Sequence, residues 1–244
     1  MGVIKIRGIV LKEIENGESS KQIVVLAKGI GKVLLSARGA RKPKSKFLAG
    51  TQLFCCSDFL VYEGRGFYSI TQVDLIESFY NLRTDIEKLA HCMYLMELLE
   101  RTCLEGMEQD EALELLYRTL RFMESKDANP KLTARIFELK YLQICGFMPE
   151  MESCAICGKG LHDQGYFSAQ AGGMVCQSHK NITCMEVSVG TQKAMNYVFD
   201  HEIRYVFGFC VSEEVLLELG DILREYMMVH MNVGLKTRSF AENL

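Results

Sequence analysis

A single change of hydrophobic periodicity, near residue 76, constrains the fold of this chain more than any other feature. Up to that point short β-rich runs alternate with glycine-containing turns, whereas from Ile76 onward apolar residues recur every three or four positions. The first pattern is typical of strands and the second of amphipathic helices. We therefore predict an α+β multidomain protein, with a β-domain over residues 1–80 and a helical domain over residues 81–244.

The first 80 residues carry enough strand signals for a small closed barrel. The runs with strand composition are Ile4–Leu11, Lys21–Ala27, Lys32–Arg38, Thr51–Tyr62 and Gly66–Leu75. About five strands in a domain of this size fit an OB-fold, a barrel that often binds oligonucleotides. An SH3-like barrel fits the strand count almost as well.

The helical part contains one segment whose two ends are both marked. Asn129 and Pro130 read as an N-cap and a first-turn proline, and Gly146 ends the helix after Cys145. Helical spacing also covers residues 86–98, 111–125, 188–200 and 213–231. The tail from Gly234 is short and polar.

A cysteine- and glycine-rich insert at residues 150–185 carries the strongest motif. Cys154 and Cys157 form a C-x2-C pair, and eighteen residues later Cys176 and His179 form a C-x2-H pair. Two such pairs wrap a tetrahedral ion while the segment between them folds back as a hairpin, so we predict one zinc ion. Four protein ligands leave no position for water, which favours a structural role over a catalytic one.

Other interpretations of these cysteines stay open. Cys154 and Cys157 could be a redox pair, although such a motif is expected at the start of a helix in a βαβ unit. Cys184 or His162 could replace His179 as the fourth ligand. The six cysteines outside the insert read as small buried hydrophobes: Cys55, Cys56, Cys92, Cys103, Cys145 and Cys210.

The net charge of −3 is distributed unevenly along the chain. Residues 1–80 contain 12 Lys and Arg against 7 Asp and Glu, a net charge of +5, whereas the other residues contain 16 against 24, a net charge of −8. Between Lys28 and Lys46 there is no acidic residue at all. Such a run suits sequence-independent contacts to phosphates, although a solvated loop without a ligand is the alternative. The predicted DNA-binding residues are Lys28, Lys32, Arg38, Arg41, Lys42, Lys44 and Lys46.

Aromatic side chains on barrel strands can stack on unpaired bases, but alternate strand positions more often belong to the core. The candidates are Phe54, Phe59, Tyr62, Phe67 and Tyr68. Which of them face outward cannot be read from the pattern.

Several classes of protein are disfavoured. The apolar runs fall far short of the roughly 20 residues that span a bilayer, so we expect no membrane segment. Ten cysteines without a recognisable signal peptide indicate a reducing compartment, hence the cytoplasm. The sequence also lacks the metalloprotease, deaminase, P-loop and nucleophile-elbow motifs, so we expect no enzymatic activity and no catalytic residue.

Several segments together resemble the RecO family of bacterial recombination mediators, in order and over nearly the full length. They are Lys5–Leu11, Ala37–Lys46, Arg135–Leu142, Gly146–Pro149, Cys154–Gly158 and Lys236–Phe240. The resemblance implies an OB-fold followed by a helical domain with the zinc element. Members often complete the metal site with a fourth cysteine, whereas this chain has His179 at that position.

The resemblance also implies a role in DNA repair by homologous recombination. The expected activities are binding of single- and double-stranded DNA, annealing of complementary strands and, with RecR, loading of recombinase onto DNA coated by single-stranded-DNA-binding protein, in the cytoplasm at the nucleoid. Arg135 and Lys140, with Arg121 as a weaker choice, are candidate contacts for the acidic C-terminal tail of that coating protein. Solvated helix charges are the other interpretation of these three residues. The alternative function is a zinc-containing protein-interaction adaptor that does not bind DNA.

Overall fold

The structure, a computed structural model, describes residues 2–161 and 165–242. By its internal contacts the chain divides into two compact units, Met1–Lys126 with Leu235–Leu244 and Asp127–Gly234. We refer to them as the first and the second unit. This division is based on contacts between residues within each unit, and it places residues 81–126 in the same unit as the barrel. The predicted boundary at residue 80 is instead based on the change from strands to helices.

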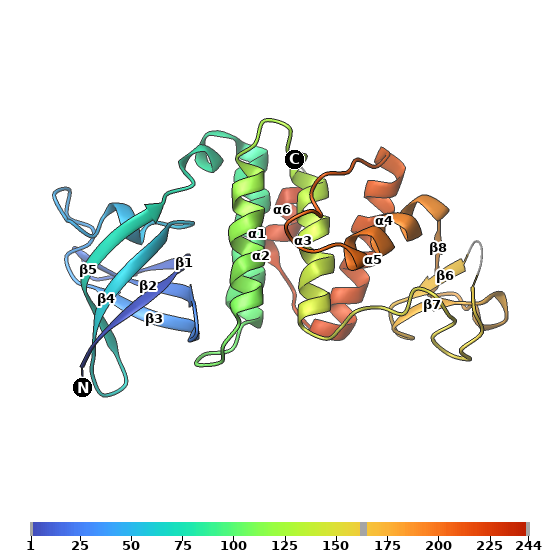
Figure 1. The fold of residues 1–244 in the computed structure, drawn as a ribbon, viewed down its shortest axis with the longest axis horizontal. Coiled ribbons are helices and arrows are strands. Elements are labelled where there is room, and N and C mark those ends of the chain that lie inside the picture. The colour runs from blue at the N-terminus through green and yellow to red at the C-terminus, as the bar shows by residue number, and fades with distance from the viewer. Residues whose placement is uncertain (1, 162–164, 243–244) are drawn as a thin grey trace. The chain divides into compact units, whose positions relative to one another are not determined.

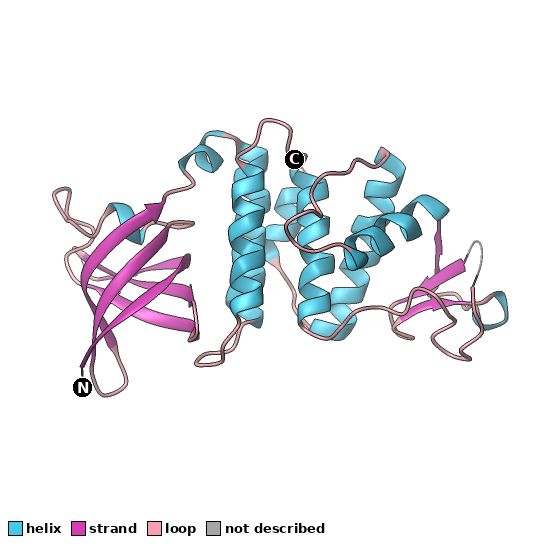
Figure 2. Ribbon diagram, viewed as in Figure 1, coloured by secondary structure: helices cyan, strands magenta, loops and turns pink. Residues whose placement is uncertain are grey.

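The β-domain is a closed barrel in the first unit (Figures 1 and 2). Its strands are β1 (Gly2–Asn16), β2 (Ser20–Ala27), β3 (Gly31–Ala37), β4 (Cys56–Glu63) and β5 (Tyr68–Glu77). They close in the order β1-β2-β3-β5-β4, with β3 and β5 parallel and the other pairs antiparallel. This is the order of an OB-fold, which confirms the predicted fold class.

The first strand is longer than predicted because it serves two neighbours. Its first half, Gly2–Ile9, pairs with β4, and its second half pairs with β2 from Gly8 to Asn16, with a bulge between Val10 and Lys12. Gly8 lies where both pairings overlap. A Cβ atom there would approach the Leu26 carbonyl oxygen to 2.4 Å, so the close approach requires glycine.

The barrel core follows the period of two that strands impose. Ile23, Val25 and Ala27 of β2 point inward beside Val33 and Leu35 of β3, and each is at most 6 % exposed. The fourth strand begins at Cys56 rather than at the predicted Thr51, which belongs to the short 3-10 helix η1 (Ala49–Thr51).

Two helices accompany the barrel in the first unit: α1 (Ile86–Thr102), which follows the 3-10 helix η2 (Tyr80–Thr84), and α2 (Asp110–Met123). The turn between β2 and β3 contacts them. The Gly29 N–H donates to Asp110 at 2.7 Å, and Lys32 Nζ donates to the Glu100 carbonyl at 2.6 Å. The sequence pattern gives no sign of this contact.

The C-terminal tail, which the sequence pattern predicts to be short and polar, forms a further helix, α6 (Lys236–Glu242). This helix packs on α1. The Thr237 N–H donates to Glu97 at 3.0 Å, and the buried Arg238 guanidinium lies 5.7 Å from the centre of the Tyr94 ring. The tail therefore belongs to the same unit as the barrel.

The second unit consists of helices and a small sheet. Its helices are α3 (Pro130–Ile144), α4 (Val189–Asp200) and α5 (Glu213–Met231), close to the predicted bounds. The Asn129 side chain accepts the Leu132 N–H at 2.9 Å, which confirms the predicted N-cap. Strands β7 (Gly173–Val175), β6 (Gly165–Ser168) and β8 (Met185–Val187) form an antiparallel sheet in that order, and η3 (Gln177–His179) is a 3-10 turn. Among the helices of residues 2–161 and 165–242, none is long and apolar enough to cross a membrane.

Candidate nucleic-acid interface and metal centre

The loop after β3, residues 38–48, holds most of the predicted DNA-binding cations. Two hydrogen bonds of 3.0 Å fix it to neighbouring segments: the Arg41 N–H donates to the Ser19 carbonyl in the β1–β2 turn, and the Gly39 N–H donates to the hydroxyl of Ser20, the first residue of β2. Successive turns within it, such as Ser45 N–H to the Lys42 carbonyl at 2.9 Å, give it a defined path. The basic loop, as we call residues 38–48, is therefore an ordered feature of the barrel.

The basic side chains of this loop differ in how far their charges are already paired within the protein. Arg38, Lys42 and Lys44 are exposed and have no side-chain partner among the described residues. Lys46 lies 5.3 Å from the centre of the Phe47 ring. Arg41 forms an ion pair with Glu15 at 2.9 Å and donates to the Gly17 carbonyl at 3.1 Å. Arg41 thus holds the loop in place as well as adding to its charge.

The other two predicted cations lie at the opposite end of β3. Lys28 is exposed in the turn before that strand, whereas Lys32 is tied by its ammonium group to α1. The structure therefore brings five of the seven predicted residues together on the loop and separates these two from them.

Burial also distinguishes the aromatic candidates. Phe54 and Phe59 are fully buried and Tyr68 is half-buried, so they belong wholly or partly to the core. Tyr62 and Phe67 are 39 % and 49 % exposed. The expectation that barrel aromatics are core residues is thus wrong for these two.

A charge cluster on β1 and β4 shows what pairing does to barrel cations. The Arg7 guanidinium donates two hydrogen bonds to Asp58, at 2.6 and 2.8 Å, and Lys5 pairs with the same carboxylate at 2.8 Å. These contacts, Arg7 foremost, hold the pKa of Asp58 well below its usual range. One of the two positive charges is thereby neutralised.

The insert brings the four predicted metal ligands together. The ligand atoms of Cys154, Cys157, Cys176 and His179 lie within 4.8 Å of one another and could hold a metal ion. His179 Nδ1 is 3.5 Å from Cys154 Sγ and 3.3 Å from Cys176 Sγ, and the Sγ atoms of Cys157 and Cys176 are 4.0 Å apart. A tetrahedral zinc site with the usual bond lengths has ligand separations of roughly 3.6–3.8 Å. The donor set therefore fits such an ion.

The backbone around the first pair makes this geometry possible. The Gly158 N–H donates to the Cys154 carbonyl at 2.8 Å, and Gly158 has a φ of +72°, which favours glycine. Burial opposes ionisation of Cys154, but N–H donors of Cys176, Cys157 and Ile156 lower the pKa of its thiol to about 5. A thiolate is the form that binds metal.

The alternatives for the fourth ligand can be compared directly. Cys184 is not part of the cluster, and its Sγ instead lies 3.4 Å from the Asn181 backbone nitrogen. His162 lies outside the described residues. The predicted strands between the two ligand pairs are present as β6 and β7.

The predicted contacts for an acidic tail lie in very different surroundings. Arg135 and Lys140 on α3 are each 5 % exposed. Arg135 forms an ion pair with the fully buried Glu138 at 2.7 Å, and Lys140 donates to Gln143 at 2.8 Å and to the Phe199 carbonyl at 3.2 Å. The interpretation as solvated helix charges is wrong for both, because they lie in the core of the second unit.

Arg121, the third candidate, is on α2 in the first unit. Its side chain is 61 % exposed and lies 3.9 Å from Glu77 and 3.4 Å from the Tyr117 hydroxyl. An acidic segment that bound Arg135 or Lys140 would have to displace internal contacts, whereas Arg121 is accessible.

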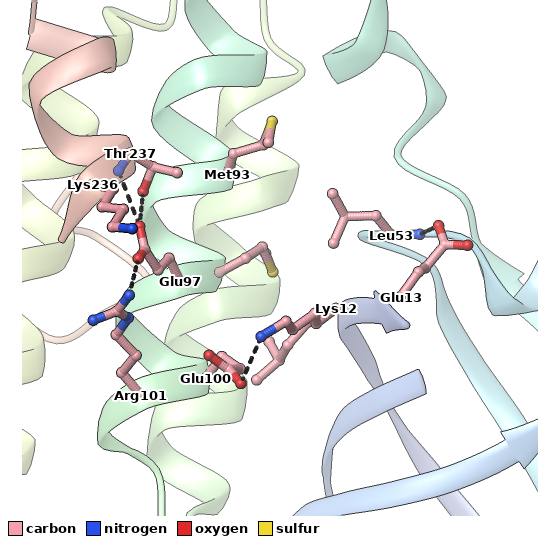
Figure 3. A pocket seen from close by; sticks show the side chains of 11 residues that line it. Lys12, Glu13, Leu53, Met93, Glu97, Glu100, Arg101, Lys236 and Thr237 are labelled. Carbon is pink, nitrogen blue, oxygen red and sulfur yellow. Dashed lines mark hydrogen bonds and ion pairs between the residues drawn. The ribbon is translucent and has the colours of Figure 1, made fainter. Parts of the chain in front are cut away.

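A cavity of about 490 Å³ lies in the first unit, beside β1, α1 and the start of α6 (Figure 3). Leu11, Leu53, Met93 and Met96 give it an apolar lining. The charges around it pair with one another: Lys12 with Glu100 at 3.2 Å, and Arg101 with Glu97 at 2.8 Å (Figure 3). Three cations and three carboxylates line it in total, so it has no net charge that would select a ligand by sign.

The cysteines outside the insert follow the prediction in part. Cys55, Cys56, Cys92 and Cys103 are buried, which confirms their assignment as small hydrophobes. Cys145 is half-buried and Cys210 is exposed, so the prediction is wrong for Cys210.

Comparison with known proteins gives matches along the whole chain. The family models described as "Recombination protein O N terminal" and "Recombination protein O C terminal" match residues 1–79 and 83–239. A relative from Acetivibrio thermocellus, named DNA repair protein RecO, is 34% identical over 246 residues, which cover 100% of this chain and 98% of the relative. Relatives with the same name from Alkaliphilus metalliredigens and Bacillus mycoides are 34% and 29% identical, with coverage of 94% and 98% of this chain and 94% and 97% of their own.

Proposed function

This chain belongs to the RecO family, and from that premise we propose that it is a DNA repair and recombination mediator that binds DNA through the basic loop of its barrel. Its family supports the repair role as such. The finer activities that we propose are binding of single- and double-stranded DNA, annealing of complementary strands and, together with RecR, loading of recombinase onto DNA coated by single-stranded-DNA-binding protein. We propose that it acts without catalytic turnover, in the cytoplasm at the nucleoid.

One observation carries the DNA-binding part of the proposal: exposed cations without carboxylate partners on an ordered loop. Arg38, Lys42 and Lys44 have no side-chain partner among the described residues, and hydrogen bonds fix their loop to Ser19 and Ser20. Cations that are not neutralised within the protein can contact phosphates and release counterions from DNA. Preorganised loop geometry reduces the entropy that ordering would cost on binding.

The salt dependence of binding tests this proposal. We expect the intact chain to bind a labelled oligonucleotide with an affinity that falls steeply as salt rises, measured by fluorescence anisotropy. Lys42→Ala/Lys44→Ala should reduce the slope of log affinity against log salt by about 2, because each phosphate contact contributes a slope of about 1. Lys126→Ala/Lys193→Ala removes the same charge at exposed positions outside the loop and should leave the slope unchanged.

The opposite result would have a clear meaning. A chain that ignores oligonucleotides even at low salt is not a DNA-binding mediator, and the interaction-adaptor function would replace the proposal. Equal effects of the two double variants would show that net charge, and not the basic loop, determines binding.

Partner recognition needs a separate measurement. Annealing of complementary strands coated with single-stranded-DNA-binding protein should proceed faster when that protein retains its acidic tail. Arg121→Ala should diminish this difference if the exposed guanidinium contacts the tail. The guanidinium is available for that contact because its ion pair with Glu77 is long, at 3.9 Å. An unchanged difference would remove Arg121 from the proposed interface.

We propose zinc as the ion of the metal centre. Three sulfur donors and one imidazole suit zinc, and three donor separations of 3.3–4.0 Å lie close to those of a tetrahedral site. When bound, the ion would crosslink the Cys154–Cys157 turn to the Cys176–His179 turn and so stabilise the β6–β7 hairpin between them.

Metal analysis of the purified protein tests this assignment. About one zinc per chain is expected for a closed structural site. Cys154→Ser should lower that content, whereas Cys184→Ser should retain it, because Cys184 lies outside the cluster. A folded protein without zinc, or equal loss in both variants, would contradict the proposal.

A further inference from the structure

The turn between β4 and β5 presents two aromatic rings to solvent. Glu63 and Tyr68 pair at the base of this hairpin, and the Gly64 N–H closes the turn by donating to the Phe67 carbonyl at 2.9 Å. Phe67 is 49 % exposed, and Tyr62 on the preceding strand is 39 % exposed. Their ring centres are 6.4 Å apart, with an interplanar angle of 46°.

The Phe67 ring lies directly against the backbone of Gly64. A Cβ atom on Gly64 would lie 2.3 Å from the ring, so only glycine leaves room for the ring against the turn. The opposite turn residue, Gly66, has a φ of +76°, a conformation that L-residues rarely adopt. The ring therefore rests on a tight turn with about half of its surface open to solvent.

Exposed apolar side chains and one cation, Arg65, accompany the two rings on this part of the barrel. Val3, 59 % exposed, pairs with Tyr62 across β1 and β4, and Leu34, 42 % exposed, lies one residue before the Leu35–Tyr68 pair. Arg65 is exposed at the tip of the turn and has no side-chain partner among the described residues.

The Glu63 carboxylate at the base of the hairpin has no ion pair with Arg65 among the described residues. Glu63 accepts a hydrogen bond from the Tyr68 hydroxyl at 3.3 Å. The hairpin thus combines exposed aromatic rings with a free cation, on the same barrel as the acid-free basic loop.

We propose that Tyr62 and Phe67 form a stacking site for the unpaired bases of single-stranded nucleic acid, with Arg65 contacting a phosphate of the same strand. Every base has a flat π-face that stacks on an exposed aromatic ring, whereas duplex bases are already stacked on their neighbours. Two rings inclined at 46° offer separate stacking surfaces rather than one flat apolar face. The inference rests on the proposed DNA-binding function and adds the selection of single strands to it.

Three probes of equal length separate base contacts from phosphate contacts. They are labelled oligothymidine, an abasic strand with the same number of phosphates, and a duplex, each titrated with the intact chain. The wild-type chain should prefer oligothymidine to the abasic strand. Tyr62→Ala/Phe67→Ala should weaken oligothymidine binding about tenfold or more and leave the other two affinities unchanged.

A conservative variant keeps the result interpretable. Tyr62→Phe/Phe67→Tyr retains both rings and should retain the preference for oligothymidine. Thermal unfolding of both double variants is measured in parallel, because Tyr62 and Phe67 are only 39 % and 49 % exposed and their truncation removes some buried contact. A fall in affinity without a change in unfolding is then attributable to the lost rings.

The outcomes distinguish this inference from the function on which it rests. If the wild-type chain binds all three probes equally and the alanine variant changes none of the three affinities, the stacking site is absent. The proposed function would still stand if Lys42→Ala/Lys44→Ala weakened binding of all three probes. If the wild-type chain binds no probe, both proposals fail. If the alanine variant weakens the abasic strand as much as oligothymidine, the hairpin contacts the backbone and the inference is wrong.

Discussion

The basic loop and helix α3 carry the same kinds of charged side chain in opposite physical states. On the loop, Lys42 and Lys44 are exposed and without side-chain partners among the described residues. On α3, Arg135 and Lys140 are each 5 % exposed and bonded to Glu138, Gln143 and the Phe199 carbonyl. The loop charges can therefore be offered to a ligand, whereas the α3 charges stabilise the second unit from within.

The difference shows why a cation in a sequence cannot be assigned a role by its type alone. A buried charge without partners costs several kcal/mol, so the α3 cations must be paired inside the protein, and the pairing removes them from binding. An exposed cation costs almost nothing to leave unpaired in water. Three substitutions test this contrast, in order of decreasing effect on stability.

Removing one partner of the buried pair should have the largest effect. We expect Glu138→Ala to lower the free energy of unfolding by about 3–5 kcal/mol, because Arg135 stays buried after the carboxylate of its ion pair is removed. Urea denaturation measures the loss. Arg135→Met/Glu138→Leu removes both charges and should cost clearly less. Equal costs for the two variants would show that packing, and not the uncompensated charge, determines the loss.

An intermediate effect is expected on the barrel, where Asp58 is buried but its partners are partly exposed. Asp58→Asn should lower the free energy of unfolding at neutral pH by about 1.5–3 kcal/mol, the range for hydrogen bonds to charged groups. Since Arg7 and Lys5 depress the pKa of Asp58 in the folded state, its contribution is fully present above an ordinary aspartate pKa of about 4 and is lost as the pH falls below that value.

The pH dependence provides the check on this assignment. Between about pH 4 and pH 2 the wild-type chain should lose stability faster than the Asp58→Asn variant. Asp221→Asn removes a surface carboxylate that pairs with Arg224 at 3.2 Å and should change neither stability nor the acid response appreciably. Parallel acid curves for wild type and Asp58→Asn would contradict the assignment.

The smallest effect on stability should come from the basic loop itself. Lys42→Ala/Lys44→Ala, the variant that we expect to reduce the salt slope of DNA binding, should change the free energy of unfolding by less than about 0.5 kcal/mol. Thermal or urea unfolding measures it. A loss comparable to that of Glu138→Ala would mean that these lysines are structural and would remove the contrast between the two regions.

Local signals predicted a large part of the architecture. The N-cap Asn129, the first-turn Pro130 and the terminal Gly146 bound α3 as expected, because each acts through contacts within a few residues of itself. The metal cluster was predicted for the same reason: the spacing within each ligand pair is short enough to determine its geometry.

Contacts between distant segments could not be predicted in this way. Thr237 bonds to Glu97 across 140 positions in the sequence, and Lys32 bonds to the Glu100 carbonyl across 68. Neither pair has a periodic or spacing signal. The tail helix α6 and the attachment of the β2–β3 turn were therefore missed.

The sequence by itself determined the change from strands to helices, a small five-stranded barrel, the four candidate metal ligands and the concentration of positive charge before residue 47. Only the tertiary structure decided which charges and rings are available: it buried Arg135 and Lys140, tied Lys32 to α1, and left Lys44, Tyr62 and Phe67 open to solvent. The physical reason is that secondary structure depends on neighbours along the chain, whereas exposure depends on which distant segment covers a side chain.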